Sequence, residues 1–172
     1  MIATGHGIIW RSHIPEIVEN YRKWSEGETS DEAVVVYDTM WHSTEKMART
    51  ITEAFARRNI PAKMYDLKEN HISDIITEIL TKKYLAVGSP TINNTIMPTV
   101  ASFLCYLRGL SPKDKNRLAF AFGSYGWGGQ SIGEVEDELK KAGFTIWLDK
   151  IRIKNIPSKE ELENITKLIL EK

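Results

Sequence analysis

Hydrophobic positions along the chain fall into two alternating patterns. Short continuous apolar runs, many of them β-branched, predict five buried strands at residues 34–37, 62–66, 84–88, 117–123 and 144–153. Between these runs and after the last one, apolar residues recur three or four positions apart, which predicts five amphipathic helices. The first of these helices is expected over residues 43–59. The pattern therefore predicts alternating strands and helices from residue 33 onward.

Residues that favour helix ends mark the boundaries of these elements. Pro98 suits the first turn of the third helix, and Gly109 is placed at its end. Gly143 is expected to cap the carboxyl end of the fourth helix. Ser158 and Glu161 have the spacing of a capping box at the start of the last helix. These signals separate the periodic segments into distinct helices.

Five strands alternating with five helices predict an α/β fold, in which helices cover both faces of a parallel sheet. Right-handed crossovers leave few topologies, and we expect the doubly wound strand order 2-1-3-4-5. Ligands of such sheets bind at the carboxyl ends of the strands, where the strand order reverses. Function is therefore expected in the loops after the first, third and fourth strands.

The loop after the first strand, residues 38–44, runs directly into a helix and contains three hydroxyl side chains. Thr39, Ser43 and Thr44 can donate to a phosphate, together with the free amides and the dipole of the helix N-terminus. The loop has no Lys or Arg, so a phosphate there would be held by uncharged donors. Ordinary helix capping explains one or two of these hydroxyls but not all three. The loop therefore favours phosphate binding.

The other two loops suit a flat aromatic ligand. Residues 89–95 contribute small polar side chains and two amides, which fit the polar edge of a heterocycle but also a plain turn-rich connection. Residues 124–129 combine glycines, which allow a ligand to approach the backbone, with the rings of Tyr125 and Trp127. A phosphate site, a polar ring edge and a stacking surface at one end of a sheet together fit flavin mononucleotide (FMN).

Other phosphate and nucleotide sites fit the sequence less well. No segment reads GxxxxGK followed by Ser or Thr, which argues against a P-loop. The glycines at 126 and 128 are not completed to GxGxxG, because position 131 is Ser. A phosphate-accepting receiver domain would need an Asp after the third strand, where this chain has Ser89 and Pro90.

The amino-acid composition limits which partners the protein can bind and in which cellular compartment it is expected. The 172 residues include 23 Lys and Arg and 23 Asp and Glu, so the formal net charge is zero and no nucleic-acid partner is expected. No apolar run approaches the roughly 20 residues of a membrane span, and the first residues lack the features of a signal peptide. The single cysteine, Cys105, favours a reducing compartment and hence a cytoplasmic protein. Its neighbours Phe103, Leu104 and Leu107 predict a packed thiol.

Three segments resemble the flavodoxin-like domain of flavodiiron proteins: VVYDTMWHSTEKMA at residues 35–48, VGSPTINNTIMP at 87–98 and AFGSYGWGGQS at 121–131. Residues 4–11, TGHGIIWR, are similar to the segment that closes the family's metallo-β-lactamase-like di-iron domain. The resemblance therefore divides the chain into residues 1–32, a remnant and linker helix from that domain, and residues 33–172, a flavodoxin-like, three-layer FMN-binding domain. His6 matches a di-iron ligand of the family, but the other ligands are missing, so no metal is expected.

The resemblance implies one non-covalently bound FMN and no catalytic side chain. Residues 39–44 would hold its phosphate, residues 90–94 would border the ring and ribityl chain, and residues 124–129 would cover the ring. Trp127 is the first stacking candidate and Trp41 the second. The complete set of expected cofactor-binding residues is Thr39, Met40, Trp41, His42, Ser43, Thr44, Ser89, Pro90, Thr91, Ile92, Asn93, Asn94, Ser124, Tyr125, Gly126, Trp127, Gly128 and Gly129.

The resemblance also implies a function, because FMN in this family relays electrons to a di-iron centre that reduces dioxygen or nitric oxide. The donor is rubredoxin, a flavin reductase or a reduced deazaflavin, and family members form homodimers or dimers of dimers. This chain is therefore expected to be a homo-oligomeric electron-transfer flavoprotein, and an oxidoreductase only together with a separate di-iron domain. Two alternatives stay open: an NAD(P)H-dependent FMN or quinone reductase, and a flavin-free interaction module of the same fold.

Overall fold

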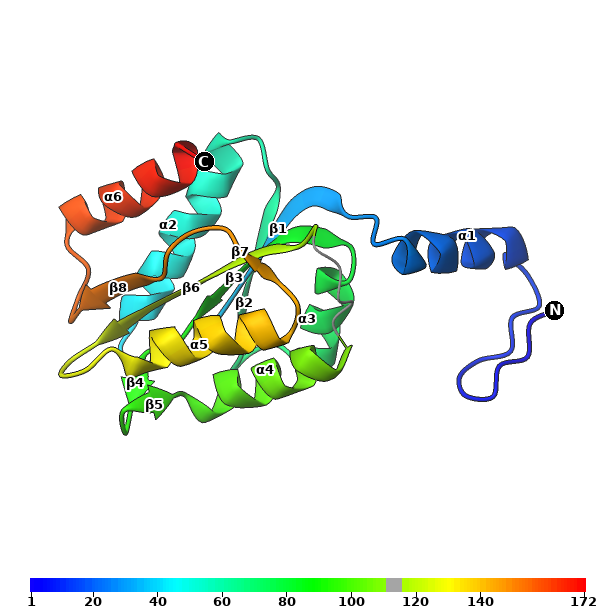
Figure 1. Ribbon diagram of the computed structural model, residues 1–172, viewed down its shortest axis with the longest axis horizontal. Helices are drawn as coiled ribbons and strands as arrows, with labels where there is room; N and C mark the ends of the chain where they lie inside the picture. The colour runs from blue at the N-terminus through cyan, green and yellow to red at the C-terminus, as the bar shows by residue number, and fades with distance from the viewer. Residues whose placement is uncertain (111–115) are drawn as a thin grey trace.

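The computed structural model describes residues 1–110 and 116–172 (Figure 1). Its elements, in chain order, are α1 (Ile14–Ser25), β1 (Ser30–Tyr37), α2 (Ser43–Arg57), β2 (Ala62–Asp66), α3 (Ile72–Ile79), β3 (Lys82–Gly88), β4 (Thr91–Ile92), β5 (Thr95–Ile96), α4 (Pro98–Leu110), β6 (Leu118–Tyr125), α5 (Gln130–Lys141), β7 (Thr145–Ile146), β8 (Ile151–Lys154) and α6 (Lys159–Leu170). The alternation of strands and helices agrees with the hydrophobic pattern.

The main sheet is parallel and has the order β2-β1-β3-β6, with β7 and β8 both paired to β6. In its centre Val35 of β1 pairs with Met64 of β2 and with Ala86 of β3, and Ala86 pairs with Phe120 of β6. The expected order 2-1-3-4-5 is therefore confirmed. It brings the carboxyl ends of β1, β3 and β6 to one edge of the sheet.

Helices cover both faces of this sheet, because side chains alternate along each strand. Val34 and Val36 lie on the face packed against α3, α4 and α5. Val35 and Tyr37 lie on the opposite face, against α2 and α6. Figure 1 shows α2 beside α6 on one side of the strands and α4 beside α5 on the other. The three-layer α/β sandwich predicted from the sequence is thus confirmed.

The fifth strand is interrupted, so the prediction of one strand over residues 144–153 is wrong in detail. Its two parts are β7 and β8. The Trp147 amide still donates to the Ala119 carbonyl of β6 at 2.9 Å, and residues 148–150 connect the two parts. Trp147 and Leu148 both pack into the α2/α6 side of the core, where the Trp147 ring stacks 5.8 Å from that of Phe55. Consecutive residues of a strand point to opposite faces, so two neighbours in one cluster require a break in the strand.

Of the helix ends predicted at Ser158, Gly143 and Gly109, two agree with the structure and one does not. The capping box of Ser158 and Glu161 is present at the start of α6. Gly143 follows α5 with a positive φ of 96°, as its predicted capping role requires. The prediction that Gly109 ends the third helix is wrong, because α4 continues to Leu110.

Cys105 is exposed on α4, so the prediction of a packed thiol is wrong. Phe103, Leu104 and Leu107 are buried. Each residue advances about 100° around a helix, so Cys105 lies about 200° from Phe103, away from the buried stripe. Apolar neighbours in the sequence therefore do not place this thiol in the core.

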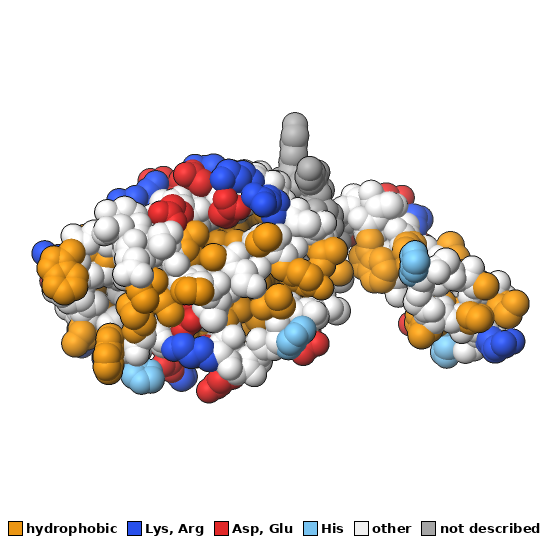
Figure 2. Space-filling model, turned by 90° about the horizontal axis from the view of Figure 1, so that it is seen from below, with side chains coloured by type: hydrophobic (Ala, Val, Ile, Leu, Met, Phe, Trp, Pro, Cys, Tyr) orange, Lys and Arg blue, Asp and Glu red, His pale blue; other side chains and the backbone are white. Residues whose placement is uncertain are grey.

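Helix α1 and the loop before it project from the body of the domain (Figure 1). No residue of α1 is buried, and Figure 2 shows hydrophobic side chains along this projecting segment. The exposed apolar residues there are Ile8, Ile9, Val18, Tyr21 and Trp24. Among the helices of residues 1–110 and 116–172, none combines the length and the apolar content of a membrane span.

Candidate cofactor site

The loops that follow β1, β3 and β6 meet at the carboxyl edge of the sheet and surround two adjoining hollows. The first hollow, of about 330 Å³, is lined by Thr39, Met40, Trp41, Ser43, Pro90, Thr91, Ser124, Tyr125, Gly126, Asn155 and Ile156. The second, of about 510 Å³, is lined by Met40, Trp41, Thr91, Ile92, Asn93, Asn94, Gly126, Trp127 and Gly128. Met40, Trp41, Thr91 and Gly126 line both hollows, so the two form one continuous concave surface.

Four of the eighteen expected binding residues, His42, Thr44, Ser89 and Gly129, line neither hollow. Thr44 is buried beneath the loop, and its Oγ1 lies 3.0 Å from Ser124 Oγ, which joins the start of α2 to the end of β6. Ser89 Oγ accepts a hydrogen bond from the Met97 amide at 3.1 Å and donates to the Pro90 carbonyl at 2.8 Å. These two hydroxyls therefore hold the loops in position from below.

The start of α2 lacks a side-chain cap, and an unpaired hydroxyl lies close to it in the sequence. His42 is the N-cap residue, with a left-handed backbone (φ 61°), and its side chain makes no capping hydrogen bond. The Thr39 side chain is buried, with the residue only 4% exposed, and its Oγ1 has no hydrogen-bond partner among residues 1–110 and 116–172. Buried polar atoms are almost always paired, and uncapped helix N-termini attract anions. The loop therefore fits the phosphate of a nucleotide.

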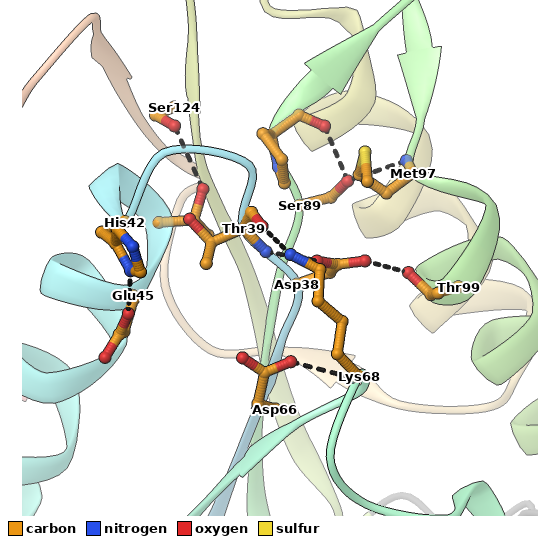
Figure 3. A network of polar contacts seen from close by, with 12 residues as sticks. Asp38, Thr39, His42, Glu45, Asp66, Lys68, Ser89, Met97, Thr99 and Ser124 are labelled. Carbon is orange, nitrogen blue, oxygen red and sulfur yellow. Dashed lines mark hydrogen bonds and ion pairs between the residues drawn. The ribbon is translucent and has the colours of Figure 1, made fainter.

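The imidazole of His42 points along α2 and not toward the core of the site. Its Nδ1 lies 2.7 Å from Glu45 Oε2 (Figure 3). Arg49 donates to the other oxygen of the same carboxylate. The hydrogen bonds from His42 and Arg49 lower the pKa of Glu45. Glu45 is thereby held as a paired carboxylate on the flank of α2.

Beneath the loop lies a polar cluster that the sequence analysis missed. Asp38 is fully buried at the end of β1 and accepts hydrogen bonds from the Thr39 amide, at 2.5 Å, and from the Thr99 hydroxyl (Figure 3). Lys68, from the segment between β2 and α3, places its Nζ 3.0 Å from Asp38 Oδ1. Its Nζ also donates to the Thr39 carbonyl oxygen. A cation therefore adjoins the loop, although the loop itself contains none.

The loop after β3, for which the sequence left open a ligand-binding edge or a turn-rich connection, forms a small hairpin, β4–β5. Asn93 and Asn94 lie at its tip, with positive φ angles of 49° and 59°. Two successive residues of this kind are typical of the tight hairpin turns that Asn tolerates. The hairpin places Asn93 and Asn94 at the wall of the second hollow.

Two indole rings stand open beside the hollows. Trp127 is fully exposed and Trp41 is 84% exposed, and both line the second hollow. Large aromatic side chains rarely stay in water without a partner. A planar ligand in this space would remove both rings from solvent, so the geometry fits a flat heterocycle next to the phosphate loop.

Asn155 and Ile156 line the first hollow and were also missed. They directly follow β8, and the Asn155 amide donates to the Tyr125 carbonyl at 2.7 Å. The carboxyl end of the fifth strand is at the same edge of the sheet as the other three. The rule that ligands bind at the carboxyl ends of parallel strands would have added the loop after β8 to the candidate binding loops.

A metal ion would be bound by a group of side chains that lie close together. Across residues 1–110 and 116–172, no three His, Cys, Asp or Glu side chains are grouped to hold a metal ion. His6 is exposed in the projecting N-terminal segment.

A doubly wound parallel sheet with a helix start that lacks a side-chain cap and with open aromatic rings at its carboxyl edge is typical of a flavodoxin-type cofactor domain. The chain belongs to the flavodoxin family, which it matches over residues 35–167. The resemblance to the flavodoxin-like part of flavodiiron proteins is confirmed, and so is FMN as the cofactor of the family.

Similar proteins extend this result. The chain is 45% identical to the nitric oxide reductase of Moorella thermoacetica, over 82% of this chain and 35% of that protein. It is 37% identical to the rubredoxin-oxygen oxidoreductase of Megalodesulfovibrio gigas, over 95% of this chain and 41% of that protein. The solved rubredoxin oxygen:oxidoreductase from Desulfovibrio gigas superposes with a TM-score of 0.85 at 36% identity, covering 90% of this chain and 38% of that one. The chain thus spans about two fifths of the length of these relatives.

Proposed function

We propose that this chain binds one FMN at the carboxyl edge of the sheet and acts as the electron-transfer domain of a flavodiiron-type protein. The observation that carries the proposal is the buried, unpartnered Thr39 hydroxyl beside the uncapped start of α2. The relatives support the same function, because their names describe oxidoreductases and a reductase of nitric oxide.

In this proposal each loop has one task. Thr39, Ser43 and the first amides of α2 bind the phosphate. The hairpin residues Asn93 and Asn94 meet the polar edge of the ring, and the ring of Trp127 covers it. Bound FMN would supply the electron transfer itself, while the protein sets its position and surroundings. None of these side chains acts as an acid or base.

We also propose that residues 1–32 are the end of a metallo-β-lactamase-like domain and that residues 33–172 are the FMN domain. The flavodoxin match begins at residue 35, yet the match to the rubredoxin-oxygen oxidoreductase covers 95% of the chain. That longer match must therefore include most of the residues before 35, which supports a flavodiiron origin for them. Because β1 begins at Ser30, the last residues before 33 already belong to the sheet.

We extend the proposal to the electron-transfer pathway in which the complete relatives act. Electrons would enter from rubredoxin, a flavin reductase or a reduced deazaflavin and leave toward a di-iron domain, where dioxygen or nitric oxide is reduced. The protein would work in the cytoplasm as a homo-oligomer. Without a di-iron domain, the purified chain should carry electrons but not consume dioxygen or nitric oxide catalytically.

Titration of the flavin-free protein with FMN, followed by flavin fluorescence, tests the binding site. We expect one FMN per chain. Thr39→Val should weaken binding roughly 10- to 100-fold, because a hydrogen bond to a charged group contributes about 1.5–3 kcal/mol. Thr50→Val is the matched control: Thr50 lies on α2, its hydroxyl donates to the Lys46 carbonyl at 3.1 Å, and FMN binding should not change. A wild-type protein that does not bind FMN would refute the proposal.

A reduction experiment distinguishes an electron-transfer domain from an NAD(P)H-dependent reductase. NADH added without oxygen should leave bound FMN oxidised if the chain depends on a protein donor. Rapid bleaching of the flavin by NADH would instead favour the alternative of an NAD(P)H-dependent reductase.

A further inference from the structure

We propose that Lys68 is a positioning residue for the phosphate of FMN, which acts by neutralising the buried Asp38 carboxylate beneath the phosphate loop. The inference rests on the proposed function and deepens it, because it names a residue outside the loop that sets the preference for a phosphorylated flavin.

The geometry places Asp38 directly under the residues expected to meet the phosphate. Asp38 is fully buried, and the amide of Thr39 donates to its Oδ1. Thr99 donates its hydroxyl to the other carboxylate oxygen, Oδ2. The carboxylate thus holds the Thr39 backbone, while the Thr39 hydroxyl has no hydrogen-bond partner in the part of the chain that the structure describes.

Lys68 contributes the positive charge of this cluster. Its ammonium lies 3.0 Å from Asp38 Oδ1 and donates to the Thr39 carbonyl oxygen. The Lys68 backbone is held in turn, because its amide donates to Asp66 Oδ1 at 2.8 Å (Figure 3). The side chains of His42 and Glu45 face each other on the flank of α2, 2.7 Å apart. Lys68 is therefore the partner that balances Asp38.

This balance matters for the ligand because a phosphate monoester is strongly negative at neutral pH. A buried, unpaired carboxylate beneath the loop would repel it, and such repulsion is strong where water does not screen it. With Lys68 in place the charge of Asp38 is paired, and the uncharged donors of the loop can bind the anion. Riboflavin has the same ring and no phosphate, so its affinity should not depend on Lys68.

The test compares FMN with riboflavin in charge variants of the full chain. Lys68→Met should weaken FMN binding roughly 10- to 100-fold and change riboflavin binding less than about threefold. Lys68→Arg, which retains the charge, should restore FMN binding to within about threefold. Lys63→Met is the matched control: Lys63 is also a half-exposed lysine in an ion pair, 2.9 Å from Glu78, but at the opposite end of β2.

A double variant separates neutralisation from direct contact with the phosphate. Lys68→Met combined with Asp38→Asn removes both charges, so most of the lost FMN affinity should return. A double variant as weak as Lys68→Met alone would overturn the proposal, since Lys68 would then act on the ligand itself. Equal losses of FMN and riboflavin binding would also overturn it, because they indicate a general distortion of the loop.

Failure of this inference is distinguishable from failure of the proposed function. If the wild-type chain binds FMN and Lys68→Met binds it equally well, only the role of Lys68 is refuted. If the wild-type chain binds neither flavin, the proposed function is refuted as well.

Discussion

Substitution of Gly123 by Ala should destabilise the domain and disturb its cofactor site. Gly123 lies in β6, where the loop after β3 passes close to the strand. A β-carbon at position 123 would lie 2.0 Å from the Ser89 carbonyl oxygen and 3.0 Å from Ile132 Cγ1. Carbon–oxygen contacts ordinarily lie about 3.3 Å apart, so the loop would have to move by more than about 1 Å.

The loss of stability in Gly123→Ala follows from the contacts that a shift of the Ser89 loop would disrupt. Overpacking a close contact destabilises by about 1–3 kcal/mol. The same shift would stretch the 3.1 Å hydrogen bond from the Ser89 amide to the Phe122 carbonyl, and one such bond contributes about 1 kcal/mol. We therefore expect the free energy of unfolding to fall by about 3 kcal/mol. FMN affinity should also fall, because the loops after β3 and β6 are forced apart.

Urea unfolding followed by circular dichroism measures this effect. With a slope of about 2 kcal/mol per M, the midpoint should drop by about 1.5 M. Gly126→Ala is the matched control for the fold, since a β-carbon there meets nothing within 4 Å. Its midpoint should stay within about 0.3 M of the wild type. A shift that small for Gly123→Ala would refute the close packing of β6 against the Ser89 loop.

Two further predictions concern the aromatic ring and a helix cap. Trp127→Ala should weaken FMN binding. Because the Trp127 ring is fully exposed, the free energy of unfolding should change by less than about 0.5 kcal/mol. If FMN binding is unchanged in Trp127→Ala but weaker in Trp41→Ala, the stacking role belongs to Trp41. Hydrogen bonds from Ser158 lower the pKa of Glu161. The stability that they contribute is therefore present above the ordinary glutamate pKa and is lost as pH falls through the lowered one. Glu161→Gln should flatten this acid limb in unfolding measured from pH 6 to pH 3, and an unchanged limb would contradict the assignment.

The sequence predicted those features that depend on local chemistry and on periodicity. The apolar runs became the central strands, and their alternating sides gave both halves of the core. Ser158, Glu161 and Gly143 cap helices as expected, because such ends depend on a few neighbouring residues. Of the three hydroxyls proposed as phosphate donors, those of Thr39 and Ser43 belong to residues that line the first hollow, whereas Thr44 is bonded to Ser124 beneath it; phosphate binding itself stays a prediction.

Features that depend on packing between distant segments escaped prediction. Lys68 reaches Asp38 from another strand connection, and no spacing in the sequence records that contact. The break between β7 and β8 arises from the fit of Trp147 and Leu148 into one cluster. Cys105 was misjudged because its sequence neighbours are apolar, although the helix turns them to another side. Whether the expected binding residues contact FMN stays a prediction.

The two open indoles give the domain a built-in optical reporter. Indole emission overlaps the absorption of oxidised flavin, so excitation energy passes from a ring to a flavin held beside it. Trp41 and Trp127 stand at the mouth of the hollows, whereas Trp147 is packed among Phe55, Tyr84 and Phe120. Occupation of the site should therefore quench the emission of Trp41 and Trp127 first, whereas Trp24, which is exposed on α1 and lines neither hollow, should keep its emission.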